Sequence, residues 1–385
     1  MELTILMPCL NESLTLLNCI NKAKKFINES DVEANILIAD NGSTDGSQQI
    51  ATDNGATVVD VKERGYGAAL IAGIKAADGK YVIMGDSDES YDFENLQPFI
   101  DELRKDNHLV MGNRFAGGVQ PNAMPFLNKY LGNPVLSFLG RLFFKTPIGD
   151  FHCGLRGFNR ERMLDIELKS PGMEFASEMV IKSVLNDLSI SEVPIKLYPD
   201  GRDRPPHLRR WRDGWRHMVL LLLFSPRWLF LYPGALLTTV GLVLMGLLSM
   251  GSIQIGEHFL DINTLLYSGA LVVAGFQVVS FAIFGKLIAS LKLSLPVKGG
   301  LEKVLNKFTL EKGITLALTL IILSAAGTFY SIHDWSLTGF GDLMPKKIMR
   351  ITIPSVVAFI LGIQTLFSSF FLKLILTDEE GNLIK

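Results

Sequence analysis

The chain has 385 residues, which is enough for two or three domains. Its formal net charge of −2 gives no overall attraction to nucleic acid, so a nucleic-acid partner is not expected. The three cysteines have no CxxC spacing, and the sequence contains neither GxGxxG nor GxxxxGK followed by Ser or Thr. These absences argue against a disulfide framework, a zinc site, dinucleotide oxidoreduction and P-loop hydrolysis.

Residues 1–200 carry charges throughout, as expected of a soluble α/β domain. Short apolar runs alternate with helical patterns, which predicts a mostly parallel sheet covered by helices on both faces. The predicted strands are 3–8, 35–39, 57–60, 80–84 and 108–112, and the predicted helices between them are 13–28, 46–54, 66–77 and 94–105.

Polar residues follow the first two predicted strands, at the edge where a doubly wound sheet binds its ligands. After the first strand, Pro8 ends the apolar run and Asn11 and Glu12 open a helix, although an ordinary helix cap would give the same pattern. After the second strand, Asp40 and Asn41 precede a turn rich in Gly and Ser. Asp40 can accept hydrogen bonds from a nucleobase or ribose, and a purely structural turn is the alternative.

The most informative segment follows the fourth predicted strand, where Asp86 and Asp88 stand one residue apart. Two carboxylates at this edge can share a hard divalent cation, with water and ligand phosphate completing the coordination. Such a site would neutralise a nucleoside diphosphate as it leaves, whereas the alternative is a solvated acidic loop. Arg64 and Gly67 lie at the start of another predicted helix, and helix N-termini attract phosphate.

In this order and spacing, the motifs resemble those of family 2 glycosyltransferases with the GT-A fold. They are PxxNE from Pro8, the segment 40–47, RGYGAAL from Arg64 and GDSDESYDF from Gly85. The segments 112–114, 150–158 and 192–195 resemble the polyprenyl-phosphate (dolichyl-phosphate) branch, which includes mannosyl- and glucosyltransferases. The catalytic resemblance covers roughly residues 1–200, and a tail of four membrane helices also occurs in some members.

The resemblance implies roles for the matching residues. Asp86 and Asp88 would hold Mg²⁺ or Mn²⁺ with the diphosphate. Arg114 would face the acceptor phosphate, for which Lys129 is a further candidate. Asn41 and Ser90 depart from the family pattern, so Glu89, Asp92 or water can supply further metal ligands. The expected nucleotide-sugar-binding residues are Pro8, Asn11, Glu12, Asp40, Asn41, Arg64, Gly67 and Asp86.

Residues 201–227 form a basic amphipathic segment next to the first predicted membrane span. Arg and Trp side chains in this position suit the headgroup level, so plain membrane anchoring explains most of them. Arg202 and Arg204 stand ahead of two prolines near the first domain, and arginine forks match phosphate oxygens. We therefore expect one or both to bind the acceptor phosphate and to join Asp86, Asp88 and Arg114 in the catalytic set.

Four segments after residue 227 lack Asp, Glu, Lys and Arg, and each is near the ~20 residues that cross a bilayer as a helix. They are 228–250, 262–285, 313–332 and 351–372. Lysines in the 291–312 loop place it in the cytoplasm by the positive-inside rule, although Lys346, Lys347 and Arg350 then lie outside. The expected organisation is a GT-A catalytic domain (1–200), a hinge (201–227), four spans (228–373) and a cytoplasmic tail (374–385), with the catalytic domain and both termini cytoplasmic.

These features predict an inverting, metal-dependent glycosyltransferase of the cell membrane. It would move glucose from UDP-glucose, or mannose from GDP-mannose, to a polyprenyl or dolichyl phosphate. A phosphate monoester has a second pKa of about 6, so this acceptor needs no strong protein base. Two alternatives stay open. One is transfer to a lipid hydroxyl or a growing polysaccharide, with Glu174 or Glu178 as base. The other is a non-catalytic scaffold that binds nucleotide sugar or lipid. Small residues in the spans are compatible with a homo-oligomer.

Overall fold

The structure is a computed structural model that describes residues 1–203, 210–293, 296, 309–341 and 345–377. The chain divides into two compact units. The first consists mainly of Met1–Phe224, and the second begins with Ser225–Lys292 and includes the helices that follow.

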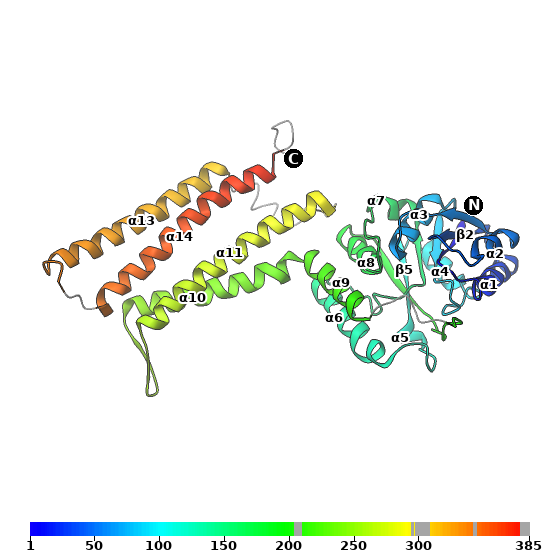
Figure 1. Cartoon of the computed structure of the whole chain (residues 1–385), viewed down its shortest axis with the longest axis horizontal. Coiled ribbons are helices and arrows are strands. Elements are labelled where there is room, and N and C mark those ends of the chain that lie inside the picture. The colour runs from blue at the N-terminus through cyan, green and yellow to red at the C-terminus, as the bar shows by residue number, and fades with distance from the viewer. Residues whose placement is uncertain (204–209, 294–295, 297–308, 342–344, 378–385) are drawn as a thin grey trace. The chain divides into compact units, whose positions relative to one another are not determined.

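The first unit is built on a seven-stranded sheet with the order β3-β2-β1-β4-β6-β5-β7 (Figure 1). Of these strands only β6 runs antiparallel to its neighbours, so the predicted mostly parallel sheet is confirmed. The strands are β1 (Leu3–Cys9), β2 (Ala34–Asp40), β3 (Thr57–Asp60), β4 (Tyr81–Met84), β5 (Leu109–Asn113), β6 (Arg156–Asn159) and β7 (Ile190–Pro194).

Helices alternate with these strands along the first part of the chain. The four predicted helices are confirmed as α1 (Leu16–Glu29), α2 (Ser47–Asp53), α3 (Tyr66–Ala76) and α4 (Gln97–Arg104). Later helices of the unit are α5 (Arg114–Gly117), α6 (Asn133–Phe144), α7 (Arg160–Asp165), α8 (Phe175–Leu185) and α9 (Arg210–Leu223). A π turn, η1 (Asn128–Gly132), leads directly into α6.

Strands β6 and β7 lie outside the predicted set. β6 reads Arg-Gly-Phe-Asn, which lacks the apolar run or alternation that predicts a strand. Its Arg156 is nevertheless fully buried, and the guanidinium donates to the backbone oxygens of Phe151, Cys153 and Ala176 at 2.7–3.0 Å. Because sequence patterns assign arginine to the surface, a buried arginine of this kind conceals the strand that carries it.

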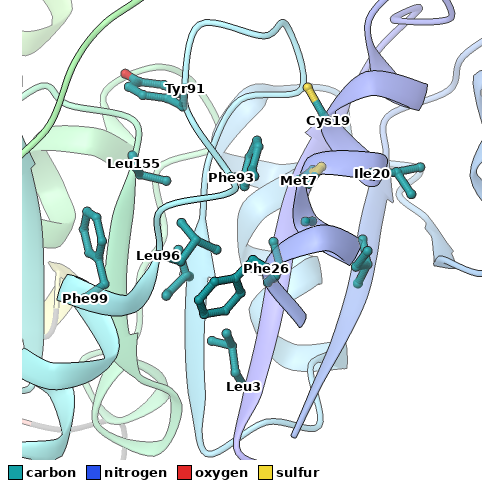
Figure 2. Packing of buried hydrophobic residues seen from close by; sticks show 14 of the residues in the cluster. Leu3, Met7, Cys19, Ile20, Phe26, Tyr91, Phe93, Leu96, Phe99 and Leu155 are labelled. Carbon is teal, nitrogen blue, oxygen red and sulfur yellow. The ribbon is translucent and has the colours of Figure 1, made fainter. Parts of the chain in front are cut away.

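A continuous apolar core joins the sheet to the helices beside it. Leu3 and Met7 of β1 belong to the same buried cluster as Phe26 of α1 and Phe99 of α4 (Figure 2). All three cysteines are free and buried, which agrees with the expectation of reduced thiols without a disulfide. Phe93, just past the Asp86–Asp88 segment, is also fully buried, so the core holds both ends of that loop.

The second unit contains four helices long and apolar enough to cross a membrane among the residues that the structure describes. They span Arg227–Met250, Ile262–Lys292, Leu310–Ser336 and Lys346–Ile375, which confirms the four predicted segments. The elements are η2 (Arg227–Leu231), α10 (Tyr232–Met250), α11 (Ile262–Leu293), α13 (Leu310–Ser336) and α14 (Pro345–Ile375), with a hairpin of β8 (Ile253–Ile255) and β9 (His258–Leu260) after α10.

Small residues bring α10 and α11 into close contact. A Cβ atom on Gly275 would lie 2.8 Å from the backbone oxygen of Gly234, and one on Gly241 would lie 2.8 Å from that of Ser268. These glycines are therefore used within the chain, as expected for close helix packing in a membrane. Gly246 has open space beside it, so it plays no part in this contact.

The basic residues that conflict with the positive-inside rule are paired with acids. Lys346 and Arg350 both contact Asp261, with the Lys346 Nζ 3.2 Å from a carboxylate oxygen. Lys347 contacts Asp334 at 3.2 Å. The positive-inside rule counts Lys and Arg and gives little weight to acidic residues, so the pairing does not remove the conflict with the predicted orientation. The orientation itself stays a prediction.

Candidate active site

The sheet order places three polar clusters at one edge of the first unit. β2, β1 and β4 are adjacent and parallel, so their carboxyl ends lie side by side. Ser87, between the two aspartates after β4, donates a hydrogen bond to the backbone oxygen of Pro8 at 2.8 Å. The Asn11 backbone N–H donates to the Ser43 hydroxyl at the same distance. The clusters that the sequence analysis took together are therefore joined in space.

Asp40 is fully buried and only partly satisfied. One carboxylate oxygen accepts hydrogen bonds from the backbone N–H groups of Gly42 and Ser43 at 3.1 and 2.9 Å, and from the Gln48 amide. No residue in the described part of the chain donates to the other oxygen. A buried acceptor without a donor is costly, so this oxygen is suited to a ligand donor such as a nucleobase N–H.

The Asn41 side chain is bound to neighbouring backbone groups through both its amide nitrogen and its oxygen. Its amide donates to the backbone oxygens of Val61 and Glu63 at 3.2 and 2.7 Å and accepts from the Gly65 N–H at 2.7 Å. It therefore ties the end of β2 to the loop before α3. Arg64 in that loop is exposed. The predicted nucleotide-binding role of Asn41 would have to act through this loop.

Gly67 is required by close packing at the start of α3. A Cβ atom there would lie 2.1 Å from the backbone oxygen of Ser170, and one on Gly65 would lie 2.1 Å from that of Pro171. The Ala68 N–H donates to the same Pro171 oxygen at 3.1 Å. The segment 169–172 therefore covers the first turn of α3, and glycine is the residue that permits the approach.

Glu178 holds that covering segment in place. Its carboxylate accepts from the backbone N–H groups of Lys169 and Ser170 at 2.7–3.1 Å and pairs with Lys182 at 3.0 Å. Glu178 is 2% exposed and Lys182 is fully buried, so this pair does not belong to a solvated helix face. Glu174 differs, since one of its carboxylate oxygens is buried and receives no hydrogen bond from the described residues.

Asp86 and Asp88 lie at the centre of the edge, and their charges disfavour one another. Burial and the neighbouring Asp88 charge raise the pKa of Asp86 to about 6, against a hydrogen bond from Tyr66 that lowers it. Asp88 accepts hydrogen bonds from Ser90 through one oxygen and faces Arg202 through the other. A pair of carboxylates held this close is suited to a shared cation.

The other acids considered as metal ligands are bound elsewhere. The Glu89 carboxylate accepts from the Asn18 amide, and the Asp92 carboxylate accepts from the Glu94 N–H and the Asn95 amide. Within the described residues, no group of three His, Cys, Asp or Glu side chains is placed to hold a metal. A cation at Asp86 and Asp88 would therefore need its remaining ligands from a diphosphate and water.

Arg202, which lies near the C-terminal end of the first unit in sequence, connects the clusters. Its guanidinium forms a two-pronged ion pair with Glu12, at 2.7–3.0 Å, and reaches an Asp88 oxygen at 2.9 Å. One cation thus bridges the loop after β1 and the loop after β4. Arg204, predicted to act with it, lies outside the described residues.

Arg114 is buried against Asp150. Two guanidinium nitrogens contact the two Asp150 oxygens at 2.7 and 2.8 Å, and the side chains are 9% and 0% exposed. Glu192 accepts from the Asp150 N–H at 3.1 Å, which fixes the partner loop. Lys129 lies on η1 with its ammonium 5.5 Å from the centre of the Tyr130 ring. Sequence reasoning did not identify Asp150 as the residue that holds Arg114.

Two buried histidines form a further polar cluster that the sequence analysis missed. The Ser177 hydroxyl lies 3.1 Å from His152 Nε2 and 2.8 Å from His217 Nδ1, which joins α8 and α9 to the loop before β6. Burial lowers the pKa of His152 well below its usual value, and the charges of His217 and Arg114 lower it further. Burial also lowers the pKa of His217 to about 4. His152 and His217 are far apart in sequence and share no motif spacing.

Acid is expected to destabilise the first unit through these histidines. Below pH 6.5 the two histidines take up protons in the unfolded chain but stay neutral in the folded chain. The free energy of unfolding therefore falls as the pH drops from about 6.5 towards 4. His217 alone would account for about 3 kcal/mol across that window. Thermal unfolding of the detergent-solubilised chain between pH 7.5 and 4.5 measures this. His217→Gln should flatten the pH dependence, and an unchanged slope would contradict the assignment.

Comparison with known proteins agrees with the fold and the membrane helices. Residues 4–165 match the family described as glycosyl transferase family 2, and residues 283–376 match the glycosyltransferase family 2 C-terminal transmembrane region. A hexosyltransferase of low-salt glycan biosynthesis, Agl6 of Haloferax volcanii, is 33% identical over 96% of this chain and 88% of that protein. A dolichyl-phosphate hexose transferase of the same organism is 29% identical over 50% of this chain and 82% of that protein.

The chain therefore belongs to glycosyltransferase family 2 and is a glycosyltransferase with four membrane helices, as the sequence motifs predicted. Among solved structures, glucosyl-3-phosphoglycerate synthase of Mycobacterium tuberculosis with Mn²⁺, uridine diphosphate and glucosyl-3-phosphoglycerate has a TM-score of 0.47. It is 20% identical and covers 58% of this chain and 80% of that one. Similarity at this level carries no argument about the site.

Proposed function

We propose that this enzyme transfers a hexose from a nucleotide sugar to a polyprenyl or dolichyl phosphate at the membrane surface. The observation that carries the proposal is the cluster of Asp86, Asp88 and Arg202 at the sheet edge, in a chain with four membrane helices. The names of the relatives support the hexose, and one of them names dolichyl phosphate. The unpartnered oxygen of Asp40 supports a nucleotide base or ribose at the same edge.

The reaction needs charge neutralisation more than a strong base. The acceptor phosphate is largely a dianion at neutral pH, so its oxygen can attack the anomeric carbon directly while the nucleoside diphosphate leaves. Mg²⁺ or Mn²⁺ at Asp86 and Asp88 would supply neutralising charge for the leaving diphosphate. Arg202, already at Asp88, would bind phosphate oxygens when ligands enter, and Arg114 would orient the acceptor. Direct displacement predicts inversion at the anomeric carbon.

A hydroxyl acceptor is the second candidate, because it would need a carboxylate base. Glu178 is unsuited to that role, since its carboxylate is bound by two backbone N–H groups and Lys182. Glu174 retains a buried oxygen that the described residues leave without a donor, so it is the base that this alternative would use. Glu174→Gln should abolish transfer to a hydroxyl and leave transfer to a phosphate within a fewfold of the unmodified chain.

The direct test is an assay with the full chain in detergent or vesicles containing a polyprenyl phosphate and Mn²⁺. Labelled UDP-glucose and GDP-mannose are supplied separately, and label in the organic phase is counted with and without a chelator. Label from one donor, lost with chelator, is the expected result and identifies the sugar. Donor hydrolysis without lipid label would contradict the acceptor. Label that persists with chelator would contradict the metal.

We also propose that the catalytic unit and both termini face the cytoplasm. The support is the larger number of lysines between residues 291 and 312 than of basic residues at Lys346, Lys347 and Arg350. Single cysteines introduced at residues 258 and 385 test this in sealed right-side-out vesicles. An impermeant reagent added outside should label position 258 and not position 385, and the reverse pattern would contradict the proposed orientation.

A further inference from the structure

Arg202 binds two loops of the candidate active site with different atoms of its guanidinium group. Nε and Nη2 form the two-pronged contact with the Glu12 carboxylate at 2.7–3.0 Å, and Nη1 lies 2.9 Å from Asp88 Oδ2. The side chains of Arg202, Glu12 and Asp88 are 13%, 4% and 10% exposed. Because the two contacts use separate nitrogen atoms, the one with Glu12 can persist when Nη1 changes its partner.

The Asp88 carboxylate has a protein partner at each oxygen. Oδ1 is held within its own loop by hydrogen bonds from the Ser90 N–H and hydroxyl, so Oδ2 is the oxygen that a cation can take. A divalent cation at Oδ2 would bring two positive centres onto one oxygen atom, where they repel each other strongly in a site with little solvent exposure. A cation that coordinates this oxygen must therefore displace Nη1 of Arg202.

The main chain around Arg202 is fixed to the same loop, so such a displacement needs only a side-chain movement. The Gly201 N–H donates to the Asp88 backbone oxygen at 2.9 Å, and the Tyr198 N–H donates to that of Ser90 at 3.0 Å. An arginine side chain has several rotatable bonds. Nη1 can therefore turn away from the carboxylate while the backbone stays bound to the loop.

A diphosphate beside the cation would give Nη1 a new acceptor. Guanidinium N–H groups and phosphate oxygens form short, charge-assisted hydrogen bonds, and the planar fork can serve more than one acceptor group. Within the described residues, no group of three His, Cys, Asp or Glu side chains is placed to hold a metal, so a cation at Asp86 and Asp88 needs the diphosphate as a ligand. The new acceptor for Nη1 therefore arrives together with the cation.

We propose that Arg202 exchanges partners when the ligands bind: Asp88 passes from Nη1 to the divalent cation, and Nη1 passes to a diphosphate oxygen. Glu12 keeps its contact with Nε and Nη2 throughout. The inference rests on the proposed function for the nature of the ligand, and it makes no use of the acceptor. The exchange links the two ligands, because a cation alone must displace a guanidinium that gains no new partner. The chain therefore binds cation and nucleoside diphosphate together, and the cation by itself binds weakly.

Mn²⁺ binding to the full chain in detergent tests the exchange without any transfer reaction. Electron paramagnetic resonance of free Mn²⁺ gives its affinity alone and with saturating UDP or GDP, corrected for Mn²⁺ that the nucleotide binds in solution. In Arg202→Gln, Mn²⁺ alone is expected to bind about fivefold more tightly, the equivalent of one partly exposed ion pair that no longer competes for Asp88. The gain in Mn²⁺ affinity that the nucleotide produces should shrink about tenfold, within the usual range of coupling between two ligands.

Arg104→Gln is the matched control. Arg104 forms an equivalent two-pronged contact with Glu2, at 2.8 and 2.9 Å, at the opposite end of β1. Both Mn²⁺ affinities should stay within about twofold of those of the unmodified chain, since exposed charges at that separation are screened by salt.

Three results would overturn the inference. Unchanged Mn²⁺ affinity without nucleotide in Arg202→Gln would mean that the guanidinium does not compete for Asp88. An equal rise in Mn²⁺ affinity with and without nucleotide would mean that Arg202 stays on Asp88 while the nucleotide is bound. An unmodified chain whose Mn²⁺ affinity changes with neither UDP nor GDP would show no coupling for an exchange to produce.

Arg202→Lys decides the question if Arg202→Gln is unstable, since the glutamine leaves Glu12 buried without a cation. Lysine keeps the charge but is a point cation without the fork that holds Glu12 and Asp88 together. Both changes in Mn²⁺ binding should keep their direction and be smaller. An Arg202→Lys chain that matches the unmodified chain would contradict the three-way contact.

The outcomes for this inference and for the proposed function are separate. An unmodified chain that binds Mn²⁺ and nucleotide together but transfers no hexose to a polyprenyl phosphate would count against the proposed function, and the Arg202→Gln comparison would still decide the exchange. Transfer to the lipid phosphate, with an undiminished nucleotide effect in Arg202→Gln, would overturn the exchange alone.

Discussion

Replacing Lys182 with methionine is expected to lower the free energy of unfolding of the first unit by about 3–5 kcal/mol. Lys182 is fully buried, pairs with Glu178 at 3.0 Å and donates to the backbone oxygen of Glu167 at 2.6 Å. Methionine fills a similar volume, so the main effect is a buried Glu178 carboxylate that has lost its cation. Hydrogen exchange of the β1 and β4 amides measures the change in the full chain, where a single two-state transition is not expected.

The same loop supplies a matched control. Lys169 is 47% exposed and forms a loose pair with Glu167 at 3.6 Å, so Lys169→Met should change stability by less than about 1 kcal/mol. Glu178→Gln combined with Lys182→Met should recover part of the loss, because the buried charge is removed and an acceptor for the Ser170 N–H remains. Equal effects of Lys169→Met and Lys182→Met would contradict the buried pair.

Lys182→Met should also disturb the candidate active site. Glu178 fixes the segment whose backbone oxygens lie against Gly65 and Gly67, so loosening it would free the first turn of α3. Asn41 holds the other side of that turn through the Gly65 N–H. Glu178 and Asn41 therefore act as positioning residues for a segment that the sequence analysis assigned to phosphate binding.

The early strands and the membrane helices were predictable because each carries a local signal. β1 and β4 are apolar runs that end at polar clusters, and the four spans are long segments without charges. β6 and the η1–α6 helix lack such a signal. β6 contains a buried arginine, and the helix is interrupted by a π turn and exposes apolar side chains.

The sequence named candidate site residues but did not predict the contacts among them. Motif order identified Glu12 and Asp88, and the position of Arg202 in the basic segment singled it out separately. Their placement beside one another depends on a contact between residues 190 positions apart. The partner of Arg114 lies 36 positions away in the segment 150–158, which the motifs identified without indicating that Asp150 would bind Arg114. The burial of Glu178 is likewise a tertiary property, since the same spacing to Lys182 occurs on solvated helices.

Asp88→Asn is expected to lower the rate of transfer to a polyprenyl phosphate by about 10²–10³-fold, the usual loss when one group that stabilises developing charge is removed. The substitution keeps the shape of the side chain and its contact with Ser90, but it removes the charge that faces Arg202 at 2.9 Å. Mn²⁺ binding, followed by electron paramagnetic resonance in the presence of nucleoside diphosphate, should weaken in parallel. Asp92→Asn is the matched control, because Asp92 lies in the same acidic loop but binds Glu94 and Asn95.

The two readouts separate two roles for the Asp88 carboxylate. Loss of both transfer and Mn²⁺ binding supports a carboxylate that shares a cation with Asp86. Loss of transfer with unchanged Mn²⁺ binding would mean that Asp88 acts by holding Arg202, whose other partner is Glu12. In that case Glu12→Gln should reproduce the defect, because a guanidinium held between two carboxylates loses its position when either charge is removed. Transfer near the unmodified rate in Asp88→Asn would contradict both roles.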